Sequence, residues 1–372
     1  METQYTQRLE KIEAVIAAWL PEKPDASWLE LVFGPLLPEG SDSQVEVVPP
    51  ELTASLTRPG WDLVNRGGKR WRPLLMLLAA ESLGGERGGE AALALTPLVE
   101  FPHNASLIHD DIEDNSDKRR GKPAVHLIYG VDTAINSGAF MYFLPLACLD
   151  AWAKKTHAQD SAKEQVWTAW ASHMRGLHLG QAMDIAWHRY NHSLPGIDQY
   201  DRMCRLKTGC LARLAAVLGV YCASLKNGAL ETRALEKLTS SFAKAAEQLG
   251  VGFQILDDVK NLCAGLPGKK RGDDIVEGKK SLPVLLYLHR YPEKRDFAAR
   301  CFAAARRVGT DAPELEEFIR ALEAAGVLEE AREKGLAYIH ESREIFSSPQ
   351  TGGFPLQPEG RALLAGLIDL LE

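Results

Sequence analysis

The stretch SLIHDDIEDNSDKRRGKP, which begins at Ser106, gathers acidic residues and follows them with basic ones. Asp110 and Asp114 are four residues apart, so on a helix they lie one above the other, with Asp111 one position round. Carboxylates this close repel one another unless cations bind among them. Mg²⁺ suits such a group, because it is held by one or two carboxylates together with water and substrate phosphates. The stretch therefore indicates a metal site beside a bound phosphate.

A second acidic pair lies much later in the chain, in the stretch FQILDDVKN. Asp257 and Asp258 again fall on an apolar, helical stretch, and Asn261 stands where a third carboxylate would be. One such cluster is as compatible with a solvated surface as with a site, but two on separate apolar helices favour a site. Basic residues follow each cluster, and they are Arg119 and Arg120 after the first and Lys269, Lys270 and Arg271 after the second. Guanidinium and ammonium groups suit phosphate oxygens.

A third basic stretch, NRGGKRWRP, lies upstream of both acidic clusters. Gly67 and Gly68 allow close backbone approach, and Lys69, Arg70 and Arg72 supply charge just before a helix. The spacing is not that of a P-loop, and by itself the stretch is most simply a basic helix entry.

The composition is that of an ordinary globular protein, with 372 residues, 45% of them hydrophobic and 25% charged. The net charge of -7 does not suggest non-specific nucleic-acid binding. We expect no membrane span, because no run of about 18 apolar residues occurs, and no secretory signal, because charges run through the first residues. Six cysteines without CxxC spacing, five of them in apolar surroundings, indicate core thiols in a reducing, cytoplasmic compartment.

Apolar residues recur at three- and four-residue spacings through most of the chain, whereas alternating strand patterns of useful length are absent. We therefore predict an all-α fold. Residues 35–60 hold many prolines and few helix formers, and they are expected to form an arm between an N-terminal helix and the main body. This gives an N-terminal helix and arm over residues 1–60 and a catalytic domain over residues 61–372. The stretch GGERGGE is expected to be a loop between helices.

In combination, these motifs resemble those of the trans-isoprenyl diphosphate synthases. The stretches GGKRWRP, LIHDDIEDNSDKRRGKP, GQAMDI, KTG, GFQILDDVKN and GKKRGDDIVEGKKSLP occur in the order seen in that family, from about Arg66 to Pro283. The stretches INSGAFMYF and LHLGQAMDIAW, and Asn261 in the second cluster, look like geranylgeranyl diphosphate synthases of the eukaryotic kind. GGKRWRP and GKKRGDD look more like bacterial members.

The resemblance implies a single-domain helical bundle with a central cavity, usually in a homodimer, and two aspartate motifs facing each other at the cavity mouth. It implies about three Mg²⁺ ions, held on the diphosphate of an allylic substrate by the five aspartates Asp110, Asp111, Asp114, Asp257 and Asp258. It assigns Arg119, Lys207 and Lys269 to the departing pyrophosphate. Residues implied for isopentenyl diphosphate are Lys69, Arg72, His103 and Arg120, and those implied for the allylic site are Gln181, Thr208 and Gln254.

Product length in this family depends on the side chain that blocks the growing prenyl chain. Ala105 and Ser106, just before the first aspartate motif, are too small to do so. The resemblance points instead to Tyr142, Phe143 and His178 as the floor, and hence to a C20 product, with farnesyl or a longer polyprenyl diphosphate as the alternative. The three floor residues are also compatible with ordinary core positions.

Three other functions remain open on the sequence alone. An HD-type phosphohydrolase would use His109 and Asp110, but it would leave Asp257 and Asp258 unexplained. A class I terpene cyclase would share the first aspartate motif without needing the stretch GGKRWRP. A regulatory subunit of a heteromeric prenyl synthase usually lacks an aspartate motif, whereas this chain has both.

Overall fold

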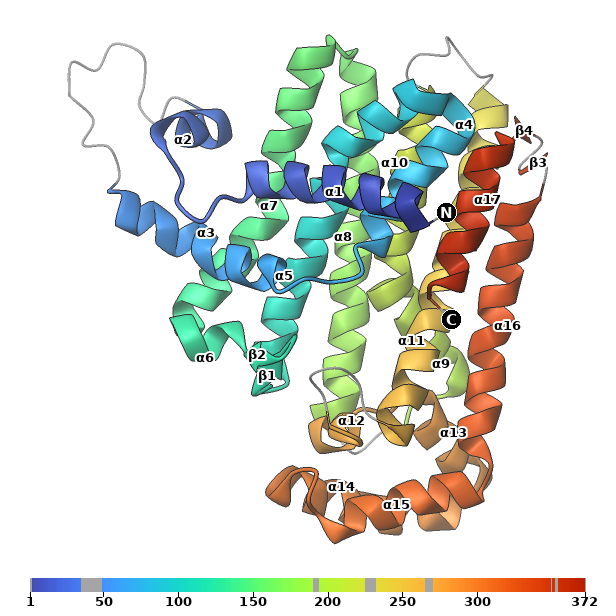
Figure 1. Ribbon diagram of the computed structural model, residues 1–372. Helices are drawn as coiled ribbons and strands as arrows, with labels where there is room; N and C mark the ends of the chain where they lie inside the picture. The colour runs from blue at the N-terminus through green and yellow to red at the C-terminus, as the bar shows by residue number, and fades with distance from the viewer. Residues whose placement is uncertain are drawn as a thin grey trace. The chain divides into compact units, whose positions relative to one another are not determined.

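The computed structural model describes residues 2–34, 49–189, 194–224, 232–264, 270–348, 350–351 and 354–371, and this part of the chain is almost wholly helical (Figure 1). The all-α prediction is confirmed. Strands in the described ranges are two residues long and form two antiparallel pairs, β1 with β2 and β3 with β4. The chain divides into two compact units, the first made of residues 1–171 and 218–230 and the second of residues 172–217 and 231–372.

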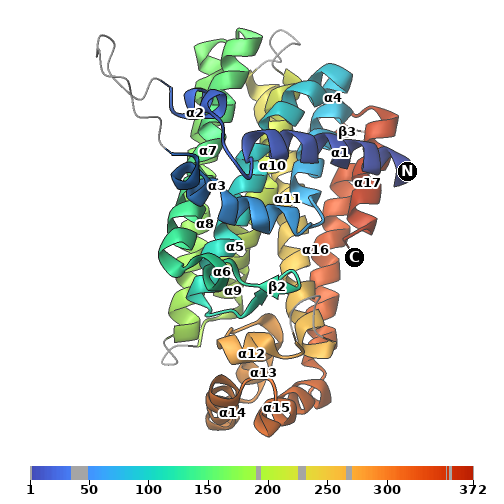
Figure 2. The ribbon, with the colours of Figure 1, turned by 60° about the vertical axis from the view of Figure 1, so that its left-hand side comes forward.

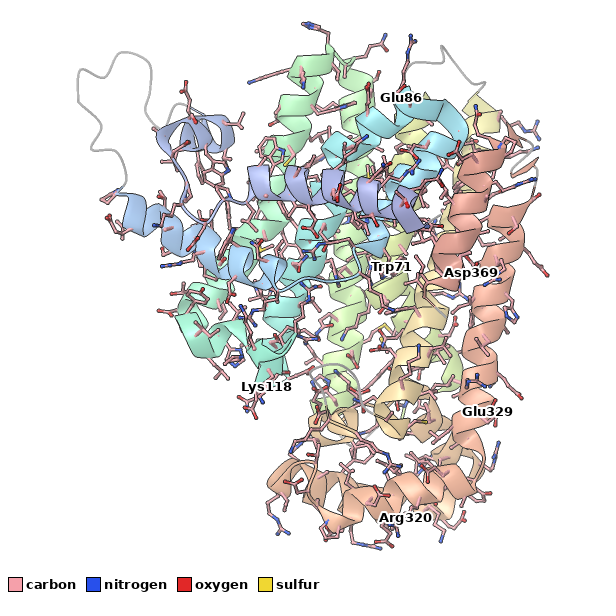
Figure 3. All side chains as sticks on the ribbon, in the orientation of Figure 1. Trp71, Glu86, Lys118, Arg320, Glu329 and Asp369 are labelled. Atoms are coloured by element: carbon pink, nitrogen blue, oxygen red, sulfur yellow. The ribbon has the colours of Figure 1, made fainter. Side chains whose placement is uncertain are left out.

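The first unit contains the N-terminal helices, the first acidic cluster and the basic stretch upstream of it. Its elements are α1 (Glu2–Trp19), α2 (Ala26–Phe33), α3 (Pro50–Asn65), α4 (Trp71–Leu95), α5 (Pro97–Glu113), β1 (Lys118–Arg119), β2 (Lys122–Pro123), α6 (Val125–Tyr129), α7 (Val131–Thr156) and the first part of α8 (Asp160–Arg189). Helix α5 packs along α7, and α4 packs against both α1 and α5. Trp71, labelled in Figure 3, begins α4 and is buried.

The first unit differs from the sequence-based predictions in two segments, residues 50–60 and the stretch GGERGGE. Residues 50–60, expected to belong to a connecting arm, form most of α3, so that part of the prediction is wrong. Pro50 stands at the start of the helix, where its missing N–H costs no hydrogen bond. Residues 35–48 lie outside the described ranges, and a division near residue 60 stays a prediction. The expected GGERGGE loop is instead a break within α4, where Gly85 has a φ of 59°.

The second unit contains the second acidic cluster. Its elements are the rest of α8, α9 (Ile197–Cys204), the π-helix η1 (Arg205–Gly209), α10 (Cys210–Ser224) as far as residue 217, α11 (Thr232–Cys263), α12 (Asp273–Glu277), α13 (Leu282–Arg290), the 3₁₀ helix η2 (Pro292–Lys294), α14 (Arg295–Val308), α15 (Pro313–Ala324), α16 (Val327–Ser347), β3 (Gln350–Thr351), β4 (Phe354–Pro355) and α17 (Pro358–Asp369).

Helices α11 and α16 lie side by side for much of their length (Figures 1 and 2). Glycines permit this close contact, because a Cβ on Gly252 would lie 2.7 Å from the carbonyl oxygen of Gly335. The pair forms the rigid frame on which the second acidic cluster is carried, since Asp257 and Asp258 belong to α11.

Burial agrees with the expected use of cysteine, because five of the six are buried free thiols and Cys263 is exposed. Two helical segments, Val131–Thr156 and Ile197–Ser224, are long and apolar enough to cross a membrane. In their most apolar windows 50% and 78% of the residues are buried, respectively. Core helices pass the same test of length and hydropathy, so these segments are weak evidence for a membrane span.

Candidate active site

The first acidic cluster lies at the C-terminal end of α5. Asp110 and Asp111 belong to the last helical turn, and Asp114 is the residue at which the helix ends. Pro102 lies inside this continuous helix, as the sequence indicated. Asp111 is completely buried, whereas the side chain of Asp110 is 16% exposed. The three carboxylates predicted to act together are therefore carried by little more than one helical turn.

A tight hairpin presents the arginine pair to this end of α5. Strand β1 pairs with β2, and the two residues between them, Arg120 and Gly121, have φ angles of 52° and 77°. Positive φ at both central positions is the geometry of a type I′ turn, which matches the twist of a two-stranded hairpin. The hairpin places Arg119 Nε 2.8 Å from Asp111 Oδ1, and Arg119 also reaches Asp110 at 3.9 Å.

Arg66 holds the hairpin in place, and sequence reasoning missed it. Its guanidinium donates to the carbonyl oxygens of Arg119 at 3.1 Å and Pro123 at 2.8 Å, and it pairs with Asp62 at 2.6 Å. Arg120 donates to the carbonyl oxygen of Leu63 at 3.0 Å. The first arginine of the basic stretch NRGGKRWRP thus positions the arginines of a motif about 50 residues away.

Positive charge surrounds His103 on α5. Burial and the nearby charges of Arg72, Arg120, Arg70 and Arg119 hold the pKa of His103 well below its usual value. Burial, followed by the charge of Arg70, lowers the pKa of Arg120 to about 10. A neutral imidazole therefore stands among four guanidinium groups, and a diphosphate would relieve their mutual repulsion. Three of the four residues predicted to bind isopentenyl diphosphate come together here, and Lys69 is exposed on the adjoining loop.

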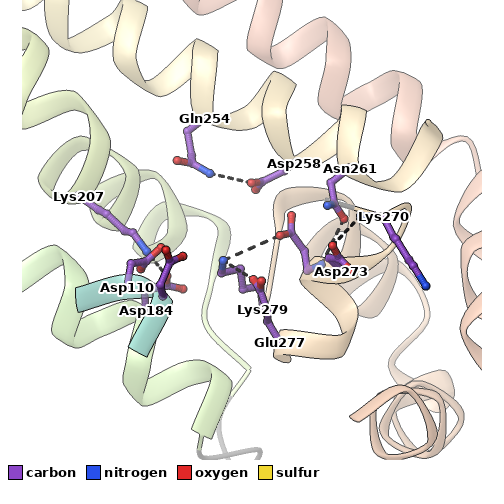
Figure 4. A network of polar contacts seen from close by, with 12 residues as sticks. Asp110, Asp184, Lys207, Gln254, Asp258, Asn261, Lys270, Asp273, Glu277 and Lys279 are labelled. Carbon is purple, nitrogen blue, oxygen red and sulfur yellow. Dashed lines mark hydrogen bonds and ion pairs between the residues drawn. The ribbon is translucent and has the colours of Figure 1, made fainter. Parts of the chain in front are cut away.

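The second acidic cluster is built around Asp258 in a connected set of hydrogen bonds. Asp258 Oδ1 accepts from Gln254 Nε2 at 2.8 Å (Figure 4). Asp258 Oδ2 accepts from the hydroxyl of Tyr200 at 2.7 Å. Gln254 Oε1 in turn accepts from the hydroxyl of Thr208 at 2.7 Å. Thr208 and Gln254, both predicted for the allylic site, are thus joined to this aspartate.

Burial, followed by the charge of Asp274, raises the pKa of Asp258 to about 7. The hydrogen bonds from Tyr200 and Gln254 act in the opposite direction, and the charge of Asp257 adds to the rise. A cation bound beside Asp258 would stabilise its ionised carboxylate, which burial and the neighbouring negative charges disfavour.

Lys207 owes its position to the π-helix η1, which interrupts the run from α9 to α10. Its Nζ lies 2.6 Å from Asp184 Oδ2 on α8 (Figure 4). A Cβ on Gly180 would lie 2.5 Å from the backbone nitrogen of Lys207, and a Cβ on Gly250 would lie 2.8 Å from the Cα of Gly209. Bare glycines of α8 and α11 therefore make room for the widened turn, a feature frequently found at functional sites.

The structure adds residues that were not predicted for this cluster. Asp184 follows Gln181 by three residues on α8, so its position in GQAMDI was the available signal. Lys279 lies 3.9 Å from Asp274 and 2.5 Å from Glu277 (Figure 4). Asn261 is buried, and its Oδ1 accepts from the backbone nitrogen of Asp274 at 3.3 Å. It therefore tethers α12 to α11.

Of the basic residues after the second cluster, Lys269 lies outside the described residues. Arg271 pairs with Glu316 at 2.5 Å and with Glu323 at 2.8 Å, both on α15. The expectation that Arg271 supplies charge to a phosphate is therefore not met, because two carboxylates already hold it. The side chain of Lys270 is 70% exposed.

The three predicted floor residues lie in different surroundings. Tyr142 on α7 is buried, and its ring centroid lies 5.8 Å from that of His109 on α5. Phe143 is 65% exposed and His178 is also exposed. The exposure of Phe143 and His178 is evidence against the alternative that all three are ordinary core residues. Tyr142 is the one of the three that is buried, and the floor itself stays a prediction.

The side chains fit a hard divalent cation by their chemistry. Both acidic clusters offer carboxylate oxygens, the ligands that Mg²⁺ prefers. Within the described ranges, no group of three or more His, Cys, Asp or Glu side chains is already gathered as a metal-binding set. Burial, followed by the negative charges of Asp274 and Asp257, raises the pKa of Asp258, and a bound cation would favour its ionised form.

Comparison with known proteins agrees with this arrangement. A family model described as polyprenyl synthetase matches residues 53–320. The chain belongs to the polyprenyl synthetase family. The matched stretch includes both acidic clusters and the basic stretch NRGGKRWRP, but it excludes α1 and α2. The family uses divalent metal.

Individual polyprenyl synthetases show the same likeness. A geranylgeranyl pyrophosphate synthase of Penicillium paxilli is 35% identical over 54% of this chain, and the match spans 48% of the relative. Another geranylgeranyl pyrophosphate synthase, of Neocamarosporium betae, is 32% identical over 74% of this chain and 73% of the relative. The solved geranylgeranyl pyrophosphate synthetase of Pyrococcus horikoshii Ot3 is 25% identical with a TM-score of 0.75, covering 99% of this chain and 98% of that one. The chain spans only about half the length of the Penicillium relative.

Proposed function

We propose that this protein is a magnesium-dependent trans-prenyltransferase, which condenses isopentenyl diphosphate with an allylic diphosphate to give geranylgeranyl diphosphate, the C20 product. One observation carries the proposal: in the first unit an acidic cluster, whose buried Asp111 is bonded to Arg119, adjoins a cluster of arginines around a neutral His103. This is what a metal-bound diphosphate next to a second diphosphate would need. Farnesyl or a longer polyprenyl diphosphate is the alternative product.

The residues of the first unit serve two tasks in this proposal. Lys69, Arg72 and Arg120 bind the diphosphate of isopentenyl diphosphate, and neutral His103 can donate a hydrogen bond to it without adding charge. Asp110, Asp111 and Asp114 are the metal ligands on α5. When bound, about three Mg²⁺ ions would neutralise charge on the departing diphosphate. Arg119 already lies against this cluster and supplies positive charge to the same group.

The residues of the second unit bind the allylic substrate. Asp257 and Asp258 are the remaining metal ligands, while Lys207 binds the diphosphate and Gln181, Thr208 and Gln254 line the site. The bond between the allylic carbon and the diphosphate oxygen breaks, and the double bond of isopentenyl diphosphate attacks the allylic cation. A proton then leaves the new cation, with the released pyrophosphate as its acceptor, so no nucleophilic side chain or redox cofactor takes part.

The competing functions fit the structure less well. A terpene cyclase would have no use for a second diphosphate site at Arg72, Arg120 and His103. An HD-type phosphohydrolase would need further histidines among the ligands, whereas Nε2 of His109 lies 3.3 Å from the carbonyl oxygen of Ile135. A non-catalytic subunit would not need both carboxylate clusters.

We also propose that the protein works as a homodimer. Apolar side chains are exposed together on α6 and α7 of the first unit, namely Leu127, Ile128, Val131, Ile135 and Phe143. A second copy of the chain is the partner that would cover such a surface.

Turnover of radiolabelled isopentenyl diphosphate with dimethylallyl, geranyl or farnesyl diphosphate tests the proposed function. The expected result is a magnesium-dependent C20 product that disappears with EDTA. Asp110→Ala and Asp257→Ala should each reduce turnover by about a thousandfold without lowering the unfolding temperature, since each removes a like charge. Asp150→Ala, which removes an exposed carboxylate of α7, is the control and should retain activity. Turnover in EDTA, or full activity in either site variant, would refute the proposal.

A further inference from the structure

Arg70 stands in the basic stretch, but its guanidinium is turned inward and not toward solvent. It is 4% exposed, and its φ of 47° lies in the left-handed region. A non-glycine residue persists there only when its surroundings hold it, because the conformation itself is unfavourable. Arg70 separates Lys69 from Trp71 and Arg72, so its conformation sets the directions in which the two predicted diphosphate ligands leave the backbone.

Four acceptors hold the Arg70 guanidinium. Its Nε donates to Glu13 Oε1 at 2.7 Å, and its Nη1 donates to Glu100 Oε1 at 3.0 Å. Its Nη2 donates to the carbonyl oxygen of Val64 at 2.5 Å, and its Nη1 also reaches the carbonyl oxygen of Gly67 at 3.4 Å. The two carboxylates come from α1 and α5, so one planar fork ties the loop to two helices at once.

The Arg70 guanidinium also lies close to the guanidinium of Arg120. A Cβ on Gly68 would lie 3.0 Å from Nη1 of Arg70 and 3.1 Å from Nη2 of Arg120, so both guanidinium groups touch the same glycine. Their like charges repel, which is part of the reason for the lowered pKa of Arg120. Without the hydrogen bonds to Glu13 and Glu100, Arg70 would move away from Arg120 and the loop would move with it.

We infer that Glu13 on α1 is a positioning residue for the diphosphate site of the first unit, acting through Arg70 on Lys69 and Arg72. The inference rests on the proposed function for the identity of the diphosphate. It extends the site to a helix that lies outside the matched stretch of residues 53–320. The side chain of Glu13 is 46% exposed, whereas the side chain of Arg70 that it binds is 2% exposed. Glu13 therefore connects the surface of α1 to the buried arginine.

Two simpler roles for Glu13 predict different results. If only its charge mattered, Glu13 would repel an anion and its neutralisation would strengthen diphosphate binding. If it only docked α1, then Arg8, whose Nε lies 2.7 Å from Glu81 Oε2 on α4, would matter as much. The apolar stripe of α1, with Tyr5, Ile12 and Ile16 buried, keeps the helix in place in either variant.

Binding of inorganic pyrophosphate to the full-length protein, measured by calorimetry in EDTA, separates these roles. Glu13→Asp keeps the charge but shortens the reach, and binding should weaken about tenfold, as when a supporting residue of a site is lost. Glu13→Gln keeps the reach without the charge, and its affinity should stay within about threefold of the original. Arg8→Ala and Glu10→Ala, the latter removing an exposed charge from the same helix, should change affinity by less than about twofold.

Unchanged binding in Glu13→Asp together with tighter binding in Glu13→Gln would overturn the inference in favour of charge alone. Equal losses in Glu13→Asp and Arg8→Ala would reduce Glu13 to a docking contact. In the prenyltransferase assay, Glu13→Asp should raise KM for isopentenyl diphosphate while leaving kcat and the allylic KM unchanged. A protein with no prenyltransferase turnover would refute the proposed function, whereas the pyrophosphate measurements would still decide the role of Glu13.

Discussion

At the scale of single residues, the arginines of the first unit divide into those that shape the site and those predicted to bind a ligand. The guanidinium groups of Arg66 and Arg70 donate to backbone carbonyls and carboxylates of the protein itself. Arg72, a predicted ligand of the diphosphate, lies with its guanidinium carbon 4.4 Å from the ring centroid of Trp71, a contact that orients it. Residues of one type in one short stretch therefore have different tasks.

This division predicts a separation of the two substrates. Arg72→Ala should raise KM for isopentenyl diphosphate by about 10- to 150-fold, because one charge-assisted phosphate contact contributes about 1.5–3 kcal/mol. The allylic KM should change little in that variant. Lys207→Ala should show the reverse pattern, and steady-state kinetics with each substrate varied in turn measures both. Equal effects on the two substrates in either variant would contradict separate sites.

His103 gives a prediction about pH. Its pKa in the folded chain is well below the usual 6.5, so below about pH 6.5 the unfolded chain binds a proton that the folded chain does not. The free energy of unfolding should therefore fall as the pH is lowered from about 6.5 toward the folded pKa, by at most about 1.4 kcal/mol per pH unit. Urea unfolding between pH 5 and 8 measures this slope.

The matched variants for that experiment are His103→Gln and His340→Gln. His103→Gln should flatten the slope that His103 causes, because it removes a group that titrates differently in the two states, and it leaves the opposite contribution of Asp258, whose pKa is raised to about 7. His340 is exposed on α16, and its replacement should leave the slope unchanged. A bound pyrophosphate should also flatten it, because negative charge among the arginines raises the pKa of His103. An identical slope in wild type and His103→Gln would contradict this account.

At the scale of elements, the π-helix η1 depends on glycine in the neighbouring helix. A Cβ on Gly180 would lie 2.5 Å from the backbone nitrogen of Lys207 and 2.7 Å from the carbonyl carbon of Leu206. Backbone atoms cannot move aside as a flexible side chain can, so η1 itself would have to shift. The positions of Lys207 and Thr208 are thus set by a residue that carries no chemistry.

Gly180→Ala should therefore destabilise the protein by about 1–3 kcal/mol and raise the allylic KM, because overpacking displaces the η1 backbone. Gly176→Ala, one turn earlier on α8, is the matched control. Its Cβ would lie 3.6 Å from Leu206 Cδ2, an ordinary contact, and the substitution should stabilise the helix by about 0.5–1 kcal/mol. Thermal unfolding and allylic kinetics measure the difference, and equal behaviour of the two variants would disprove the proposed role of Gly180.

At the scale of the whole molecule, we expect helix α7 to influence both product length and dimer assembly. Tyr142 is buried against α5, whereas the next residue, Phe143, is 65% exposed. Adjacent residues on a helix point about 100° apart, so one helix can present an inner and an outer side. We expect the inner side to limit the prenyl chain and the outer side to contact a second copy.

Tyr142→Ala should lengthen the product to C25 and beyond while leaving the oligomeric state unchanged, because it opens space inside the first unit. Phe143→Glu should shift the protein from dimer to monomer, because it places a charge in the proposed interface. Product chromatography and light scattering after size-exclusion chromatography measure the two outcomes. A C20 product from Tyr142→Ala would contradict the role of Tyr142 in limiting the prenyl chain. A wild-type monomer would contradict the role of Phe143 in a dimer interface.

The sequence by itself determined the helical class, the family and the positions of the acidic and basic clusters. These follow from local information: the spacing of apolar residues, carboxylates four apart on a helix, and the order of motifs along the chain. The family resemblance assigned Gln181, Thr208 and Gln254 to the allylic site. In the structure, hydrogen bonds join Thr208 and Gln254 to Asp258, and the role of these residues stays a prediction.

Only the tertiary structure decided which charged side chains serve the protein itself. The sequence suggested Arg271 as a phosphate ligand, but Arg271 pairs with Glu316 and Glu323, which are 45 and 52 residues away. Phe143 reads like a core residue but is exposed, because burial depends on the elements that pack against a helix and not on its own sequence. The bond from Glu13 to Arg70 joins residues 57 apart, and no local pattern specifies such a pair. Contacts between distant segments decide whether a charge is neutralised, and therefore whether it is left to act on a ligand.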